Sequence, residues 1–498
     1  MDPRRVLAIA GIGAVLVIAL GLALSLFRYS QLRGRVPTGV SAAGVPLGGL
    51  SQEQAEALLQ EEVAAPLNLP VQLSYLAETV PLLPSQVGFQ VDVVAIATEA
   101  LRLSEEANRG FLAGFLGYLM GQEPLGRQEV PLVTTIDEPA LRGFLIRLGQ
   151  EKDRPLRPVT AITNSYVFDP GQSSRTLDVE TSFTRVADAL TMVGDRRADL
   201  VVLEEHPQPP PLSDLVALAE HRVQEFPGIV GFYVLDLSSD EADGFNESVV
   251  FSGMSLLKIG VMLQTLIDFN DEALTEGMTN LMWGLPTDPG QRTNELLAQI
   301  GQGDAVAGAR RVTSTMADLG LERTLILWPY RIETARAAGA RLASQRPMPA
   351  ARPSDQETNP DPFIQTTPEE IVRLLGMTYR CSQDAGALRD AFPERLTADD
   401  CRFILEVLET NPIGTWIRSG IPSGLRFAHK HGFSAQTIAD AGIVFSPGGD
   451  YAIGIFAFAN VSWLGCFPHP VFYDISRAAY GYFNLESGPW EPPAPTCF

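Results

Sequence analysis

Lysine is almost absent from this sequence. Of the 37 basic residues only three are lysines, and the rest are arginines; the three are Lys152, Lys258 and Lys430. Arginine stays protonated in proteins, whereas a buried lysine can lose its proton near neutral pH. A lysine kept in so arginine-rich a chain is therefore a candidate for a catalytic amine.

Positive charge is scarce in general. The 59 acidic residues outnumber the basic ones and give a net charge of −22. An acidic surface repels phosphate groups, so we expect no nucleic-acid partner. The hydrophobic share of 45% is enough for packed cores, and the length of 498 residues indicates two or three domains.

Cysteine and histidine are also rare. The few histidines have no zinc-site spacing and no C-x-x-C pair occurs, so we predict neither a metal nor a cofactor. Four cysteines permit two disulfides, which are typical of an oxidising, extracytoplasmic setting; four buried thiols are the alternative. The pairs closest in sequence are Cys381 with Cys401 and Cys466 with Cys497, among three possible connectivities.

One long uncharged run is present, at residues 6–27. Its 22 residues are enough to cross a hydrocarbon core of about 30 Å as a helix. A cleaved signal peptide is the competing interpretation, but no A-x-A-like cleavage site follows. We therefore expect a single-pass anchor in the cell membrane with the remaining domains outside the cytoplasm, although arginines on both sides of the run leave its orientation open.

Residues 38–205 have the pattern of a small α+β module. Residues 39–60 predict a strand, a turn and a helix, with Ser51 and Gln54 at capping-box spacing. A related order recurs at residues 165–190. The segment resembles the peptidoglycan-binding repeat that often follows a membrane anchor in bacterial wall proteins, including the vancomycin-resistance W-type family. A spacer without binding function is the alternative.

Four prolines in nine residues mark a linker at residues 204–212. Beyond it, residues 213–498 begin and end with strand patterns and carry helical patterns between them. Strands from both ends of one segment predict a single α+β domain: an antiparallel sheet with flanking helices and a helical insert.

The chemistry is predicted at FSGMSLLKIG, residues 251–260. On a helix that opens at Ser255, Lys258 shares a face with the serine one turn away. A serine hydroxyl needs a base to become a nucleophile, and a lysine of lowered pKa can be that base. The S-x-x-K spacing alone is weak, because it occurs by chance in many helices. Lys430 adds weight, since it lies on a predicted strand two residues before Gly432.

Together these motifs resemble the serine β-lactamase and penicillin-binding-protein superfamily, closest to class A β-lactamases. S-x-x-K matches Ser255 and Lys258, and the K-[ST]-G strand motif matches Lys430-His431-Gly432. The resemblance implies a β-lactamase-like fold over residues 213–498, with Ser255 as nucleophile and Lys258 taking part in its deprotonation. It implies an oxyanion hole of the Ser255 and Phe433 backbone N–H groups beside Gly432, and a substrate carboxylate held by Lys430.

The chain departs from the family pattern at three places. In residues 285–298, Asp288 or Thr287 stands where the S-D-N serine is expected, and Asn294 begins the helix motif that follows. His431 replaces the hydroxyl residue of K-[ST]-G. Residues 351–365 lack the glutamate that activates the deacylating water in class A enzymes, and Glu357 stands at a different distance.

The expected function is a membrane-anchored, extracytoplasmic serine acyl hydrolase. It would act through an acyl-enzyme on β-lactams or on D-Ala-D-Ala peptide amides of peptidoglycan. A Ser–His hydrolase is disfavoured because His429 and His431 share the strand face opposite to Lys430. A catalytically silent wall-binding or scaffolding protein on the same fold is the alternative.

Overall fold

The computed structural model describes residues 3–32, 34–107, 111–120, 127–269, 273–330 and 356–487. The chain divides into two compact units. The first holds residues 1–157 and 173–206, and the second holds residues 158–172 and 207–498. The boundary at residues 206 and 207 falls within the predicted linker. The hairpin 158–172 differs from prediction, because it belongs to the second unit and not to the N-terminal module.

The first unit is a small α+β assembly around one apolar core. Ser51 caps its second helix with the predicted capping box to Gln54. Parallel β11–β3 and antiparallel β3–β4 pairing make one three-stranded sheet, and β2, β1 and β6 make another. Its helices are α1 Pro3–Leu32, α2 Gln52–Leu59, α3 Ala65–Leu67, α4 Val93–Ala107, α5 Phe111–Leu119, α6 Glu138–Lys152 and α7 Val179–Thr191. Its strands are β1 Val40–Ala42, β2 Val45–Pro46, β3 Val71–Tyr75, β4 Glu78–Leu82, β5 Gln90–Val91, β6 Gln128–Val130, β7 Thr134–Thr135, β10 Ser174–Leu177, β11 Arg197–Asp199 and β12 Val202–Glu205.

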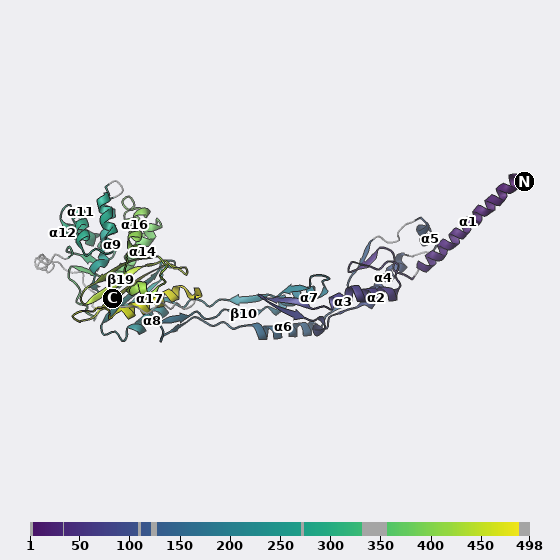
Figure 1. Cartoon of the computed structure of the whole chain (residues 1–498), viewed down its shortest axis with the longest axis horizontal. Helices are drawn as coiled ribbons and strands as arrows, with labels where there is room; N and C mark the ends of the chain where they lie inside the picture. Colours follow the sequence, from purple (N-terminus) through teal and green to yellow (C-terminus); the bar gives the residue numbers. More distant parts are fainter. Residues whose placement is uncertain are drawn as a thin grey trace. The chain divides into compact units, whose positions relative to one another are not determined.

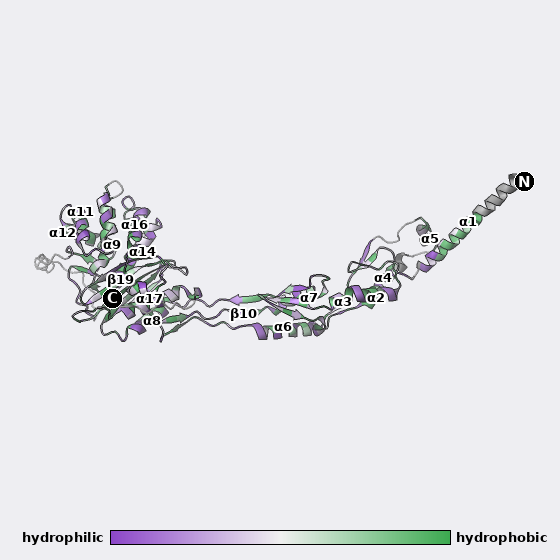
Figure 2. Ribbon diagram, viewed as in Figure 1, coloured by the Kyte–Doolittle hydropathy of each residue, from purple (hydrophilic) through white to green (hydrophobic). Residues whose placement is uncertain are grey.

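The predicted membrane anchor, residues 6–27, falls within α1. From residue 15 onward its apolar side chains are largely exposed, and Figure 2 shows this part of α1 as hydrophobic. Over the described ranges, no helix reaches the length and apolarity that a bilayer crossing requires. The side chains of residues 6–14 lie outside the described part of the chain.

The second unit is built on a five-stranded antiparallel sheet of order β14-β13-β20-β19-β18. Its strands come from both ends of the unit: β13 Ile229–Asp236, β14 Ala242–Phe245, β18 Phe427–Phe433, β19 Thr437–Val444 and β20 Tyr451–Phe458. Alternate residues of β13 face opposite cores, so that Val230, Phe232 and Val234 pack on one side. The mixed α+β fold predicted from the sequence is confirmed.

Helices cover both faces of this sheet (Figure 1). One face packs against α8 Leu212–Val223 and α17 His469–Phe483, and the other against the helices of the insert. The insert's helices are α9 Lys258–Asp268, α10 Glu276–Trp283, α11 Gln291–Ile300, α12 Ala305–Asp318, α14 Pro368–Ser382, α15 Ala387–Ala391 and α16 Ala398–Glu409. Short strands β15 Phe251–Ser252, β16 Leu325–Ile326 and β17 Ile364–Thr366 form a second, three-stranded sheet.

A disulfide joins two helices of the insert. Cys381 in α14 is bonded to Cys401 in α16, which confirms this predicted pair. Cys466 is disulfide-bonded as well. Its predicted partner, Cys497, lies outside the described residues.

The hairpin of β8 Thr160–Ile162 and β9 Val167–Asp169 packs on the α8/α17 face. Phe168 is 3% exposed, and its ring lies 5.6 Å from that of Tyr482. Arg222 of α8 stacks over Tyr166 and forms an ion pair with Asp474 of α17. These contacts explain why the hairpin is part of the second unit.

Candidate active site

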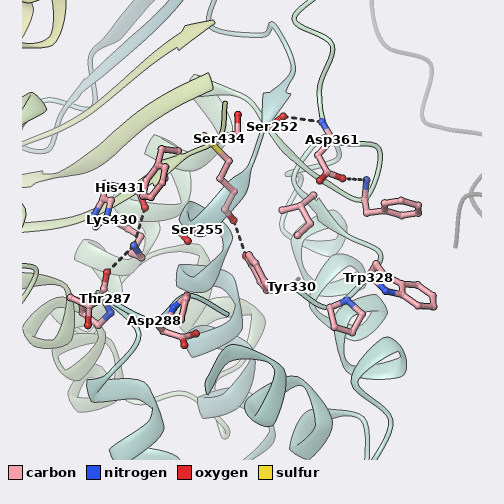
Figure 3. Close-up of a pocket in the computed structure, with 18 residues that line it drawn as sticks. Ser252, Ser255, Thr287, Asp288, Trp328, Tyr330, Asp361, Lys430, His431 and Ser434 are labelled. Atoms are coloured by element: carbon pink, nitrogen blue, oxygen red, sulfur yellow. Dashed lines mark hydrogen bonds between the residues drawn. The ribbon is translucent and has the colours of Figure 1, made fainter. Parts of the chain in front are cut away.

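Ser255 lies on a tight turn and not inside an α-helix. A 3₁₀ turn, η3 Met254–Leu257, precedes α9, which starts at Lys258. Met254 has a left-handed backbone with φ 47°, so an α-helix cannot start before it. The helix predicted to open at Ser255 is thus three residues too long at its start. The turn sets Ser255 at the wall of a pocket of about 370 Å³ (Figure 3).

Lys430 lines the same pocket from the edge strand β18 (Figure 3). It is only 1% exposed. Its Nζ donates hydrogen bonds to the carbonyl oxygens of Pro286, at 3.1 Å, and of His431, at 2.9 Å. Burial and then the positive charge of Lys258 lower the pKa of the Lys430 amine to about 7.

Lys258 is fully buried beside the pocket. Its Nζ lies 3.5 Å from Oδ2 of Asp288 and donates a hydrogen bond to the backbone oxygen of the same residue. The ring of Tyr330 covers it, with a distance of 5.4 Å from Nζ to the ring centroid. Neither amine points into solvent, and both reach the loop 286–288.

Asp288 lies three residues before α11, and its carboxylate accepts several hydrogen bonds. Its carboxylate accepts from the backbone N–H groups of Arg292 and Thr293 and, at 2.6 Å, from the Thr293 hydroxyl. Burial alone would raise the pKa of Asp288, but the Thr293 hydrogen bonds and the charge of Lys258 outweigh it and lower the pKa. Asp288 is therefore an ionised counter-ion for Lys258.

The edge of β18 presents backbone groups to the pocket. Ser434 donates its N–H to the Thr437 oxygen, so residues 432 and 430 pair with β19 and the backbone groups of Phe433 point away from it. A Cβ on Gly432 would lie 3.1 Å from the Ser255 nitrogen, so the two backbones are in close contact. The Ser255 and Phe433 N–H groups thus lie on the same edge of the pocket, as an oxyanion hole requires.

Asn294 does not line this pocket. Its side chain accepts from the Tyr330 N–H and donates to the Tyr330 oxygen, both at 2.8 Å. It therefore holds the segment that carries Tyr330, and the structure does not place it with the predicted substrate-binding residues.

Tyr330 is a pocket residue that the sequence motifs did not mark. Its hydroxyl donates to the backbone oxygen of Met254 at 2.8 Å, directly beside the Ser255 turn (Figure 3). Burial, with the nearby charges of Asp288 and Asp361, raises the pKa of Tyr330, so its phenol stays protonated. In the sequence, Tyr330 follows a tryptophan and a proline at the end of an apolar run. No motif spacing marks this position as part of a pocket.

The two histidines of β18 are engaged elsewhere. His429 Nδ1 lies 2.9 Å from Asp440 Oδ1 on β19, and His431 Nδ1 lies 3.0 Å from the Asn411 amide. Burial and the charge of Lys430 lower the pKa of His431 to about 2, so it is neutral. This geometry agrees with the expectation that a Ser–His pair is disfavoured.

No glutamate lines the described part of the pocket. Glu357 is exposed, and residues 351–355 of the predicted loop lie outside the described residues. Asp361 is the acid at the opposite rim, where its N–H donates to Ser252 Oγ at 2.9 Å (Figure 3). Within the described ranges, no three His, Cys, Asp and Glu side chains are placed to hold a metal ion.

Part of the second unit is similar to a known family. Residues 303–483 match the family model described as the beta-lactamase enzyme family. This range contains Lys430 and ends before the C-terminus, but it begins after Ser255 and Lys258. No curated protein matches the sequence significantly.

The chain is also similar to solved structures. The chain resembles PBP-A at 17% identity, with 55% of this chain and 99% of that one covered and a TM-score of 0.40. A beta-lactamase from Desulfarculus baarsii DSM 2075 matches at 14% identity, 55% and 99% coverage and a TM-score of 0.40. The TLA-1 extended-spectrum beta-lactamase matches at 17% identity, 54% and 98% coverage and a TM-score of 0.39. Similarities of this size carry no argument, and the chemistry is inferred below from the pocket around Ser255.

Proposed function

We propose that this chain is a serine acyl hydrolase of the β-lactamase and penicillin-binding type. One observation carries the proposal: Ser255, a buried lysine amine and the free backbone edge of β18 meet in one pocket. Support comes from the similarity of residues 303–483 to the beta-lactamase enzyme family.

In this proposal the Ser255 hydroxyl attacks the carbonyl carbon of an amide. A buried amine accepts the hydroxyl proton, and the electrons of the carbonyl bond move to its oxygen. The N–H groups of Ser255 and Phe433 stabilise that oxyanion, an effect of about 3–4 kcal/mol per donor in a comparable site. As the intermediate collapses, the protonated amine gives its proton to the amide nitrogen, the carbon–nitrogen bond breaks, and an ester remains on Ser255.

The lifetime of that ester depends on how fast water attacks it. Rapid hydrolysis needs a base that activates water, and no glutamate lines the described pocket. We therefore propose slow deacylation, as in penicillin-binding proteins, with β-lactams and D-Ala-D-Ala peptide amides as the acyl donors.

The location of the activity is also part of the proposal. The Cys381–Cys401 disulfide is typical of an oxidising compartment, outside the cytoplasm. Membrane attachment through residues 6–27 and peptidoglycan binding by residues 38–205 rest on sequence patterns alone. Their test is recovery of the full chain with membranes and its co-sedimentation with purified peptidoglycan.

Covalent labelling with a fluorescent penicillin tests the chemistry. The wild type should retain the label through denaturing electrophoresis, and Ser255→Ala should lose it entirely. Ser434→Ala is the matched control, because Ser434 lines the same pocket from the turn after β18 and should leave labelling in place. Equal labelling of Ser255→Ala would exclude Ser255 as the nucleophile. Absence of labelling in the wild type, with intact muropeptide binding, would favour the silent wall-binding alternative.

A further inference from the structure

The carbonyl group of Met254 and the N–H group of Ser255 belong to one peptide unit. That unit is planar and trans, so its oxygen and its N–H point in opposite directions. Its nitrogen lies against β18, 3.1 Å from the place that a Cβ on Gly432 would take. Any group that holds the Met254 oxygen therefore also sets the direction of the Ser255 N–H, which is a donor of the proposed oxyanion hole.

The backbone at Met254 does not hold this orientation unaided. Its φ of 47° is left-handed, which is unfavourable for a residue with a side chain. Such a conformation persists only where surrounding contacts fix it. The Gly253 N–H donates to the Ile364 oxygen at 2.7 Å, and the Tyr330 hydroxyl donates to the Met254 oxygen at 2.8 Å (Figure 3). The phenol thus anchors the peptide unit that carries the Ser255 N–H.

Tyr330 is itself held in place by the start of α11. Its backbone N–H and its backbone oxygen both bond to the Asn294 side chain at 2.8 Å. Gly290 directly precedes the helix with φ 125°, and a Cβ there would lie 2.6 Å from the Tyr330 Cβ. A glycine at this position therefore lets the tyrosine pack closely against the helix. Because its backbone and its side chain are both fixed, the phenol has a defined direction.

The surroundings of Tyr330 also keep its phenol a donor. Burial, followed by the charges of Asp288 and Asp361, raises its pKa, so the hydroxyl keeps its proton. A carbonyl oxygen that accepts a hydrogen bond polarises its own peptide unit, and the N–H of that unit becomes a stronger donor. Both the direction and the strength of the Ser255 N–H therefore depend on this bond.

We propose that Tyr330 is a positioning residue for the oxyanion hole: its hydroxyl, bonded to the Met254 oxygen, aims and polarises the Ser255 N–H across one peptide unit. The assignment rests on the proposed function and adds to it a residue that neither the S-x-x-K nor the K-[ST]-G motif contains. Tyr330 acts here only through the peptide between Met254 and Ser255.

The effect of this bond belongs to the transition state of acylation. The carbonyl oxygen of the acyl donor gains its negative charge only when Ser255 Oγ attacks, so a weaker N–H donor lowers the rate more than it weakens binding. Loss of a whole oxyanion donor lowers a rate by about 10²–10³-fold. A donor that is still present but less well aimed should cost less, about 10-fold.

Tyr330→Phe removes the hydroxyl and keeps the ring. We expect its maximal rate of acylation by penicillin to fall by about 10-fold, while the half-saturating penicillin concentration stays close to that of the wild type. Tyr482→Phe is the matched control, because the Tyr482 hydroxyl also donates to a backbone oxygen, that of Pro210, at 2.8 Å. Tyr482 is not among the described residues that line the pocket, so this variant should acylate like the wild type.

Infrared difference spectra of the acyl-enzyme give a readout that a loss of stability alone would not move. Penicillin that is isotope-labelled at its β-lactam carbonyl carbon marks the ester on Ser255. The stretching band of this carbonyl falls in wavenumber as the hydrogen bonds to its oxygen become stronger. In Tyr330→Phe the band should therefore lie at higher wavenumber than in the wild type and in Tyr482→Phe.

An ortho-fluorinated tyrosine at position 330 provides a second variant if Tyr330→Phe does not fold. The fluorine makes the phenol more acidic and so a stronger donor, and the hydroxyl that bonds Met254 is kept. The ester band should then move to lower wavenumber than in the wild type. An ester band that stays in place would overturn the assignment.

The results that contradict the inference are distinct from those that contradict the proposed function. A wild-type acylation rate or an unmoved ester band in folded Tyr330→Phe would overturn the role of Tyr330. An equal fall of the rate in Tyr482→Phe would also overturn it, because the loss would then follow from any missing phenol bond. A wild type that penicillin never acylates would refute the proposed function instead.

Discussion

At the scale of single residues, the scarcity of lysine singled out two amines that the structure buries. Lys258 and Lys430 are buried in or beside the pocket, whereas Lys152 makes an exposed ion pair with Glu78. The sequence could not say which amine has a counter-ion. That depends on where the loop 286–288 lies, and Asp288 contacts Lys258 across 30 positions of the chain. For the same reason spacing alone placed Asn294 in the pocket, although its side chain is used to hold Tyr330.

The buried Lys430 amine should give the protein a distinctive stability profile. Its pKa is lowered from 10.5 to about 7 in the folded protein. Between these values the unfolded chain carries a proton there that the folded protein lacks, so wild-type stability rises with pH. Methionine does not titrate, so Lys430→Met lacks this contribution. The stability of the variant relative to the wild type should be highest at and below pH 7 and should fall towards pH 10.5.

Urea denaturation across this pH range measures the effect. The difference in unfolding free energy between the two proteins should change by up to several kcal/mol over the range. A difference that does not vary with pH would mean that Lys430 keeps its proton in the folded protein.

At the scale of elements, the sequence predicted the strands better than the start of α9. The pattern of residues 427–433 gave both the strand β18 and the opposite faces of Lys430 and its flanking histidines. Strand faces follow from alternation alone. The start of α9 depends instead on the left-handed Met254, which is fixed by tertiary contacts such as the bond from the Gly253 N–H to the Ile364 oxygen.

The contact between β18 and the Ser255 turn makes Gly432→Ala a sensitive probe. Its new Cβ would lie 2.9 Å from Met254 Cβ and 3.1 Å from the Ser255 nitrogen, so β18 and η3 must separate. We expect a loss of stability of about 1–3 kcal/mol. Because the proposed oxyanion donors lie on these two elements, the penicillin acylation rate of the folded variant should also fall.

A second glycine of the same unit supplies the control. A Cβ at Gly424 would meet nothing within 4 Å, so Gly424→Ala should leave both stability and acylation close to the wild type. Denaturant midpoints and labelling rates of the two variants provide the comparison. Unimpaired acylation in folded Gly432→Ala would show that close packing of β18 on the serine turn is not needed for the chemistry.

At the scale of the whole molecule, the two units meet in the chain within the proline-rich segment, but no sequence pattern gives the path of the chain across that boundary. Proline content marks a linker wherever it occurs, so residues 204–212 were recognisable. The transfer of residues 158–172 to the second unit depends on long-range contacts, such as Phe168 with Tyr482. No local pattern distinguishes a hairpin that packs within its own unit from one that packs on another.

The packing of this hairpin can be tested by fluorescence, because all five tryptophans follow residue 206 and so report on the second unit. Phe168 is 3% exposed in the core beneath α8 and α17. Phe168→Ala should therefore destabilise the tryptophan-monitored transition by about 3–5 kcal/mol. Ile162→Ala, on the same hairpin at a side chain 43% exposed, should shift it by no more than about 0.5 kcal/mol. If Phe168→Ala leaves the tryptophan midpoint unchanged, the hairpin contributes nothing to the stability of the second unit, and the N-terminal module would extend unbroken through residues 158–172.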